Sequence, residues 1–304
     1  MINDGKIYTH QPIHGTPAKI MLPRGTGLVL EGGGTRGYYS SGVFEAFMEE
    51  GLMFPYIIGV SAGAANALTY IAGQKGRAKQ IIENCVGDPR YVSKKNLILH
   101  GSLFDFGFIF GDVPQKHIAF DWDVFNDCDT RFLIGTLNCA DGSTVWHEKD
   151  SLDEALTPII ASCSIPGLAR IVKYRGLELL DGGICDPIPV EKSIADGNEF
   201  NVIVMTRNPG YVKKPFGKEW LMRLLFRKHP AVAEAVKRRH ELYNRQVELC
   251  ERLEREGRAI IIRPLEPLKV NRSSIDISAL SELHDEGYRE GKAALEKLRE
   301  IIKY

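Results

Sequence analysis

The sequence predicts an α/β fold in which a mostly parallel central sheet is flanked by helices. Short apolar runs typical of buried strands alternate with helical segments from Gly27 onward. Two glycine-framed turns, 31–37 and 59–63, each lie between such a run and a helix, and a third turn, 181–183, ends another apolar run. Alternation of this kind implies parallel strands covered by helices.

The first half of the chain supplies the clearest elements. Residues 1–25 contain several prolines and glycines, which predicts an irregular N-terminal arm. After it, the hydrophobic pattern predicts strands at 28–31 and 56–60, and helices at 38–50, 62–72 and 77–85.

The middle of the chain is less regular. Residues 96–129 are rich in aromatic residues, glycine and aspartate but poor in periodicity, which predicts a long excursion near an active-site mouth. Ser151 and Glu154 have the spacing of a capping box, which predicts a helix over 151–162. Strands are expected at 131–139, 144–147, 168–174, 177–180 and 201–206, with a hairpin turn at 140–143 and the last strand central in the sheet.

The composition changes after Pro209. The pattern there predicts charged helices at 220–226, 231–256 and 278–302, and one strand at 259–263. We therefore divide the chain into an arm (1–25), a catalytic domain (26–208) and a mainly helical C-terminal extension (209–304) that packs on or beside the core.

Composition limits the function classes. The 304 residues carry 39 basic and 39 acidic side chains, so no global charge favours nucleic acid as a partner. The sequence shows no signal-peptide pattern and no membrane-length apolar run, so a cytoplasmic location is expected. The six cysteines show no ligand spacing, which predicts free, mostly buried thiols, and we expect neither a metal nor an organic cofactor.

The turn at 59–63 has the sequence Gly-Val-Ser-Ala-Gly. A nucleophilic serine on a sharp strand-to-helix turn needs small neighbours, and Gly59 and Gly63 meet that need around Ser61. The following helix dipole would favour developing negative charge. Taken alone, the motif more often marks a glycine-rich turn whose serine caps a helix.

The turn at 31–37 offers a row of main-chain amides that an oxygen can approach, as in an oxyanion hole. Arg36 in this loop is expected either to hold a phosphate or to form a structural salt bridge. The loop also fits a dinucleotide-binding fingerprint, but Val60 and Ser61 occupy the position where the ribose-binding acid is required. A phosphate-binding NTPase loop is excluded because no Gly-Lys-Ser/Thr follows the glycines.

A serine nucleophile needs a base. Asp181 ends a predicted strand and is followed by Gly182 and Gly183, which would let a hydroxyl approach the carboxylate. A lone Asp-Gly-Gly is more often a simple turn. An α/β-hydrolase order would instead use a later histidine, but His229, His240 and His284 all lie among charged helical residues, where solvated histidines are expected.

These three motifs, in this order, resemble the patatin-like phospholipases, and the stretch 161–167 (Ala-Ser-Cys-Ser-Ile-Pro-Gly) is similar to one that precedes the aspartate in that family. The resemblance covers about residues 26–206 and implies a three-layer patatin-like fold in a bacterial member with a C-terminal extension. One departure is Glu31, which stands where the family usually has aspartate. We expect this change to have little effect on the amide row. The site residues that the resemblance implies are a Ser61–Asp181 dyad, an oxyanion loop of Gly32, Gly33, Gly34, Thr35, Arg36 and Gly37, the elbow glycines Gly59 and Gly63, and the aspartate turn Gly182 and Gly183.

The expected function is a serine lipid acyl hydrolase that works through an acyl-enzyme. An acyltransferase or thioesterase with the same dyad, and a non-catalytic lipid-binding protein on the same fold, are the alternatives. Cations interleaved with apolar residues over 213–228 are compatible with a helix at the inner face of a membrane. A helix packed on the core with solvated charges explains the same pattern.

Overall fold

The computed structural model describes residues 13–301 in full and the backbone of Ile302. Its main sheet has the order β10-β9-β2-β4-β5-β8-β7, with β6 pairing with β5. The five strands from β10 to β5 are parallel, whereas β6 and β8 run antiparallel to β5, and β7 runs antiparallel to β8. The strands are β2 (Thr26–Leu30), β4 (Tyr56–Val60), β5 (Arg131–Asn138), β6 (Thr144–Glu148), β7 (Val172–Tyr174), β8 (Leu177–Asp181), β9 (Phe200–Val204) and β10 (Ala259–Ile262).

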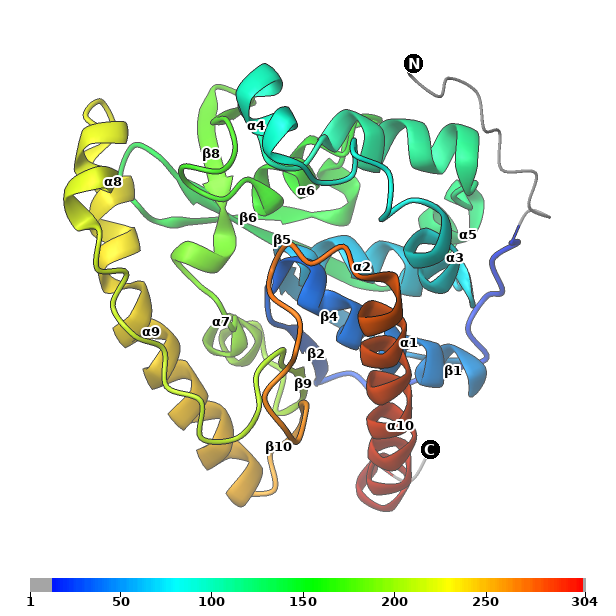
Figure 1. The fold of residues 1–304 in the computed structure, drawn as a ribbon. Helices are drawn as coiled ribbons and strands as arrows, with labels where there is room; N and C mark the ends of the chain where they lie inside the picture. The colour runs from blue at the N-terminus through cyan, green and yellow to red at the C-terminus, as the bar shows by residue number, and fades with distance from the viewer. Residues whose placement is uncertain (1–12, 303–304) are drawn as a thin grey trace.

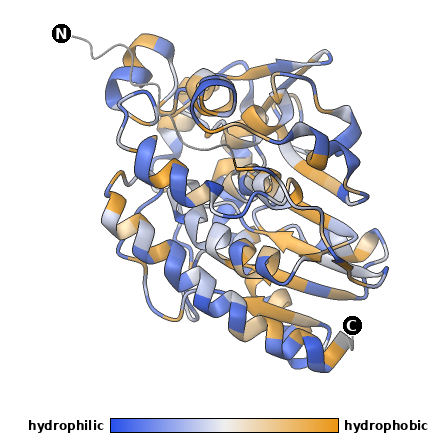
Figure 2. Ribbon diagram, turned by 90° about the vertical axis from the view of Figure 1, so that its right-hand side faces the viewer, coloured by the Kyte–Doolittle hydropathy of each residue, from blue (hydrophilic) through white to orange (hydrophobic). Residues whose placement is uncertain are grey.

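Helices cover both faces of this sheet, so the predicted three-layer α/β architecture is confirmed (Figure 1). One face packs on α1 (Tyr38–Glu49), α2 (Ala62–Ile71) and α10 (Ile277–Ile302). The other packs on α7 (Val190–Ala195) and α9 (Pro230–Arg255). Figure 2 shows hydrophobic strands at the centre and helices of mixed hydropathy around them. Alternate residues of one strand, such as Val29 and Leu30, enter different cores, because successive side chains point to opposite faces.

The last third of the chain joins the same sheet. β10 pairs in parallel with β9, and α10 packs beside α1, where Lys292 forms ion pairs with Glu49 and Glu50. α8 (Glu219–Leu225) and α9 precede them. β9 was predicted to be central, but β10 lies outside it, so β9 is second from the edge of the sheet.

Three other predictions need correction. Residues 1–12 of the predicted arm lie outside the described residues, and the rest of the arm contains β1 (Ile20–Met21), which pairs with β3 (Leu52–Met53). The segment 96–129 is largely helical, with α4 (Lys94–His100), a π-helix (Phe108–His117) and α5 (Trp122–Asp127). α3 (Arg77–Asn84) precedes it close to the predicted bounds.

The predicted helix over 151–162 is also wrong in its first half. Lys149–Ser151 is a single 3₁₀ turn, and α6 covers only Thr157–Cys163. The Ser151 hydroxyl donates to the Glu148 carbonyl instead of capping a helix. Leu156 adopts φ 53°, a left-handed conformation that breaks the helix before it.

Candidate active site

Ser61 and Asp181 meet although 120 residues separate them. Ser61 Oγ donates to Asp181 Oδ2 at 2.9 Å, and both side chains are buried. The sheet register explains the meeting, because Val60 pairs with Gly135 on β5 and the next residue of β5, Thr136, pairs with Asp181. The antiparallel β8 thus ends level with the Ser61 turn, with β5 between β8 and the strand β4 that leads into Ser61.

The turn at Ser61 is strained and crowded. Ser61 has φ 54° and ψ −132°, outside the regions that residues with a Cβ normally adopt. A Cβ added at Gly63 would lie 2.7 Å from the Glu31 carbonyl oxygen, so only glycine fits there. This geometry agrees with the strand-to-helix elbow predicted from the sequence, because β4 ends at Val60 and α2 begins at Ala62.

A second serine holds this strained turn in place. Ser162 Oγ accepts a hydrogen bond from Ser61 N at 2.8 Å and donates to the Gly135 carbonyl at 2.7 Å. Two residues on, the Ser164 carbonyl accepts from Asp181 N at 2.9 Å. The stretch 161–167 therefore positions both members of the Ser61–Asp181 pair. Sequence reasoning quoted this stretch but gave Ser162 no role.

Burial raises the pKa of Asp181 above that of an ordinary aspartate. Four opposing effects lower it: the positive charge of Arg239, the hydrogen bond that Gly183 N donates to Oδ1 at 2.7 Å, the bond from Ser61, and the positive charge of Arg272. Oδ1 is thus fixed by the main chain while Oδ2 faces the serine. The predicted aspartate turn at Gly182 and Gly183 lies directly at this carboxylate.

The glycine loop after β2 lies against Ser61. Leu30 pairs with Gly59, and a Cβ added at Gly32 would lie 2.9 Å from Ser61 Cβ. Within the described chain, the N–H groups of Gly33 and Gly34 donate to no other main-chain oxygen, whereas Thr35 N donates to the Arg272 carbonyl at 3.0 Å. Asn66 Nδ2 donates to the Gly37 carbonyl at 2.8 Å and fixes the far end of the loop on α2.

Two charged residues of this loop, Glu31 and Arg36, have buried side chains. Glu31 is buried, and its Oε2 accepts from Thr206 N at 2.6 Å, which ties the loop to the end of β9. Arg36 is also buried, but it forms no ion pair with any described residue, and its Nε has no hydrogen-bond partner.

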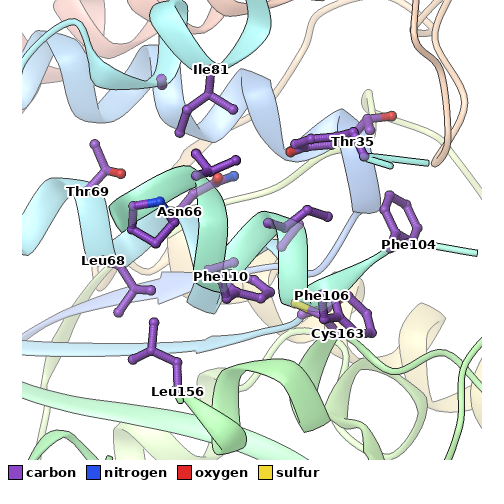
Figure 3. Close-up of a pocket in the computed structure, with 18 of the residues that line it drawn as sticks. Thr35, Asn66, Leu68, Thr69, Ile81, Phe104, Phe106, Phe110, Leu156 and Cys163 are labelled. Atoms are coloured by element: carbon purple, nitrogen blue, oxygen red, sulfur yellow. The ribbon is translucent and has the colours of Figure 1, made fainter. Parts of the chain in front are cut away.

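An apolar pocket of about 130 Å³ opens beside Ser61. Side chains from α2, the 104–122 segment and Leu156 surround it (Figure 3). About a third of the lining residues belong to the region 96–129, which the sequence placed near the active-site mouth. The aromatic residues among the lining are Tyr38, Tyr91, Phe104, Phe106, Phe110, Phe120 and Trp122.

None of the three candidate histidines lines the apolar pocket or the smaller polar cavity that also borders Ser61. His229 and His240 are partly exposed and lie near Glu178 and Glu241. His284 was expected to be solvated, but it is 1% exposed within the packed α10. Among the described residues, no cluster of three potential metal ligands occurs. No described helix has the length and apolar character needed to cross a membrane.

Comparisons with known proteins agree with the motifs. The chain is 30% identical over 183 residues to the uncharacterized protein YjjU of Escherichia coli, covering 59% of this chain and 51% of that one. It is 26% identical over 289 residues to the lysophospholipase NTE1 of Scheffersomyces stipitis, covering 89% of this chain and 18% of that one. The chain thus spans about half or less of these relatives.

Among solved structures, VipD from Legionella pneumophila aligns with a TM-score of 0.46 at 14% identity, covering 98% of this chain and 72% of that one. Residues 229–303 match a domain of unknown function (DUF6363). Residues 28–194, more than half of the chain, match the patatin-like phospholipase family. The chain therefore belongs to the patatin-like phospholipase family.

Proposed function

We propose that the protein is a serine lipid acyl hydrolase in which Ser61 is the nucleophile and Asp181 is its base. The observation that carries this proposal is the 2.9 Å hydrogen bond between Ser61 Oγ and Asp181 Oδ2 beside an apolar pocket. A carboxylate held this close can take the hydroxyl proton without an intervening imidazole. The family and the lysophospholipase relatives favour a lipid ester as the substrate.

The steps balance as acyl transfer to water. Ser61 Oγ attacks the ester carbonyl while its proton passes to Asp181, and the N–H groups of Gly33 and Gly34 stabilise the oxyanion. The C–O bond to the alcohol breaks as Asp181 returns the proton to the leaving oxygen, which leaves an acyl-enzyme. Water then attacks this ester with Asp181 again as base, and the fatty acid leaves Ser61 free.

The pocket supports an apolar acyl group. Its lining is dominated by aromatic and aliphatic side chains, with Ser61 at its border. Burial of an alkyl chain against such a surface contributes roughly 0.8 kcal/mol per methylene. A fatty acyl ester would therefore be held with its carbonyl at Ser61.

We further propose that the enzyme acts at the inner face of a membrane, with the segment 213–228 as the contact. Trp220 is 67% exposed and Leu224 is 56% exposed, while Met222 of the same helix packs in the core. Arg223, Arg227 and Lys228 lie among these apolar residues. Exposed tryptophan and leucine flanked by cations suit an anionic lipid surface.

A second pair of exposed apolar side chains lies on α4, where Ile98 is 83% exposed and Leu99 is 58% exposed. α4 and α8 both adjoin the segment 167–168: Leu103 N, just after α4, donates to the Leu168 carbonyl, and a Cβ at Gly167 would contact Met222 and Leu225. Both helices lie toward one end of the molecule (Figure 1). One membrane surface would then contact both helices beside the aromatic residues that line the apolar pocket.

The test of the proposed chemistry is labelling by a fluorescent fluorophosphonate, which traps an activated serine whatever the acyl substrate is. Wild type is expected to label and Ser61→Ala is not. A folded wild-type protein that does not label, and hydrolyses no acyl ester, would overturn the proposed function.

A further inference from the structure

Ser61 borders a second cavity, of about 50 Å³, which shares Gly34 and Ile165 with the apolar pocket. The two cavities differ in chemistry. The second is lined by the glycine loop, by Asp181, and by cationic side chains that come from four separate parts of the sequence. These cationic residues are Arg36, Arg207, Lys213, Arg239 and Arg272.

The positive charge of this cationic pocket is not neutralised by the protein. In the part of the chain that the structure describes, none of the five cations forms an ion pair with a carboxylate. Asp181 is the acid in the lining, and Glu31 is held nearby by Thr206 N. Arg36 is 7% exposed, and its Nε lacks any hydrogen-bond partner. Five cations thus face two acids in a region where unpaired charge is costly.

Burial and the charges of neighbouring cations lower the pKa values of Arg36 and Lys213. Burial and the neighbouring Arg207 lower the pKa of Arg36 to about 10. Burial, followed by the charge of Arg239, lowers the pKa of Lys213 to about 7, and Arg36 and Arg272 act in the same direction while Glu31 opposes them. A bound anion would relieve this repulsion and restore the proton on Lys213.

Hydrogen bonds fix the side chain of one cation, Arg239, and the main chain of two others, Lys213 and Arg272. Arg239 Nε donates to the Gly183 carbonyl at 2.5 Å, next to Asp181. The main chain of Lys213 is fixed by Asn244, which accepts from its N–H at 2.8 Å and donates to its carbonyl at 3.1 Å. The Arg272 carbonyl accepts from Thr35 N, and the approach is so close that a Cβ at Gly34 would lie 2.2 Å from this oxygen. The pocket is therefore preorganised.

The position of the pocket in the sheet also favours a ligand. β2 is flanked by β4 on one side and β9 on the other, so the strand order reverses beside β2. Arg36 follows β2 and Arg207 follows β9, which places both at the carboxyl ends of parallel strands. Open α/β sheets bind their ligands in the crevice at such a point.

We propose that this cationic pocket binds the phosphate of a lipid head group and selects acyl esters with a net negative head group over zwitterionic ones. This inference rests on the proposed function of Ser61. Guanidinium groups suit phosphate because they offer paired N–H donors. An ammonium head group would gain little cation–π attraction here, because Arg207 already faces the ring of Tyr211. Its guanidinium carbon lies 4.3 Å from the ring centroid.

The kinetic test compares lysophosphatidate with lysophosphatidylcholine of the same acyl chain, and both with an uncharged p-nitrophenyl ester. We expect wild type to favour lysophosphatidate about tenfold or more in kcat/KM, equivalent to about 1.4 kcal/mol. The double variant Arg207→Gln/Lys213→Gln should lose this preference through a higher KM. Lys237→Gln/Arg238→Gln, which also replaces one lysine and one arginine but at exposed positions of α9, is the control and should keep it.

Two kinetic results would overturn the proposal. One is a wild type that cleaves lysophosphatidylcholine as efficiently as lysophosphatidate. The other is a double variant that keeps the wild-type ratio between these two substrates.

A binding test separates this proposal from the proposed chemistry. Ser61→Ala is titrated calorimetrically with sn-glycerol 3-phosphate and with inorganic phosphate, with and without the Arg207→Gln/Lys213→Gln change. Binding of sn-glycerol 3-phosphate that the double change weakens at least tenfold supports the site even if no ester is cleaved. Binding of inorganic phosphate alone would identify a free-anion site and overturn the lipid assignment, and binding of neither would overturn the pocket itself.

Discussion

The hydroxyl of Ser162 bridges the main chains of Ser61 and Gly135, accepting from Ser61 N at 2.8 Å and donating to the Gly135 carbonyl at 2.7 Å. This bridge holds a residue whose backbone is in a rarely populated conformation, with φ 54°. The proposed nucleophile Ser61 therefore depends on a neighbour that would touch no reacting atom.

Ser162→Ala is expected to lower kcat by roughly tenfold to a hundredfold with a smaller change in KM, because the nucleophile loses its alignment with Asp181. The buried N–H and carbonyl left without partners should also cost about 1–3 kcal/mol of unfolding free energy. Steady-state kinetics and denaturant unfolding measure the two effects.

Ser164→Ala is the matched control for this variant. Ser164 is equally buried, and its hydroxyl donates to the Ile160 carbonyl without contacting Ser61. Its loss should reduce stability more than kcat. Equal kcat values for the two variants would argue against a positioning role for Ser162.

The dyad itself is tested by Ser61→Ala and Asp181→Asn. Each should lower ester hydrolysis by roughly 10⁴-fold or more while the protein stays folded. Because burial raises the pKa of Asp181 in the folded state, its ionised form costs stability at neutral pH. This cost fades as the pH falls through the raised folded-state pKa, and it is gone below the unfolded value of about 3.9. Asp181→Asn should therefore have a Tm at pH 7 equal to or above that of wild type.

The pH profile reports on Asp181 more directly. The carboxylate must be ionised to accept the serine proton, so kcat/KM should fall on acidification at a pH above the ordinary aspartate range. The charge of Arg239 lowers the pKa of Asp181, so Arg239→Met should move this acidic limb to higher pH. Lys237→Met, at an exposed position of the same helix, should leave the limb where it is. A limb that stays in place or moves to lower pH in Arg239→Met would contradict the assignment.

Membrane contact is tested by flotation with liposomes that contain anionic lipid. Replacing Trp220 and Leu224 with serine should reduce the bound fraction several-fold, because two exposed apolar side chains no longer enter the interface. Leu265→Ser, which removes a similarly exposed side chain elsewhere, is the control. An unchanged bound fraction for the Trp220/Leu224 double variant would contradict the proposed membrane contact. Binding of wild type to neutral liposomes at high salt would show that the cations of the segment contribute little to the affinity.

The sequence predicted the parallel part of the fold well because the strands there are short apolar runs, and glycine-containing turns follow β2 and β4. Tyr56–Val60 and the start of α1 at Tyr38 match the predictions residue for residue. The predictions failed where tertiary contacts override local pattern. Ser151 and Glu154 have the spacing of a capping box, yet the left-handed backbone of Leu156 delays the helix until Thr157.

The cationic pocket lay beyond sequence reasoning for a different reason. Its five cations are spread from Arg36 to Arg272, and no spacing rule connects them. They converge only because β9 lies beside β2 and because α9 passes the Asp181 turn. The sequence pointed to two of them: Lys213 as part of the segment 213–228, and Arg36 with phosphate binding and a salt bridge as equal alternatives. In the described structure Arg36 has no ion pair.

The border position of Ser61 between two cavities bears on the order in which products depart. In the proposed reaction, the acyl half stays attached to Ser61 once the ester bond breaks, while the charged half is free to leave. The compartment it vacates is the one from which the next nucleophile must come. A water molecule arriving there completes a hydrolysis, whereas a second phosphate-bearing alcohol arriving there would carry the acyl group away, so turnover between two lipids would need no further binding site.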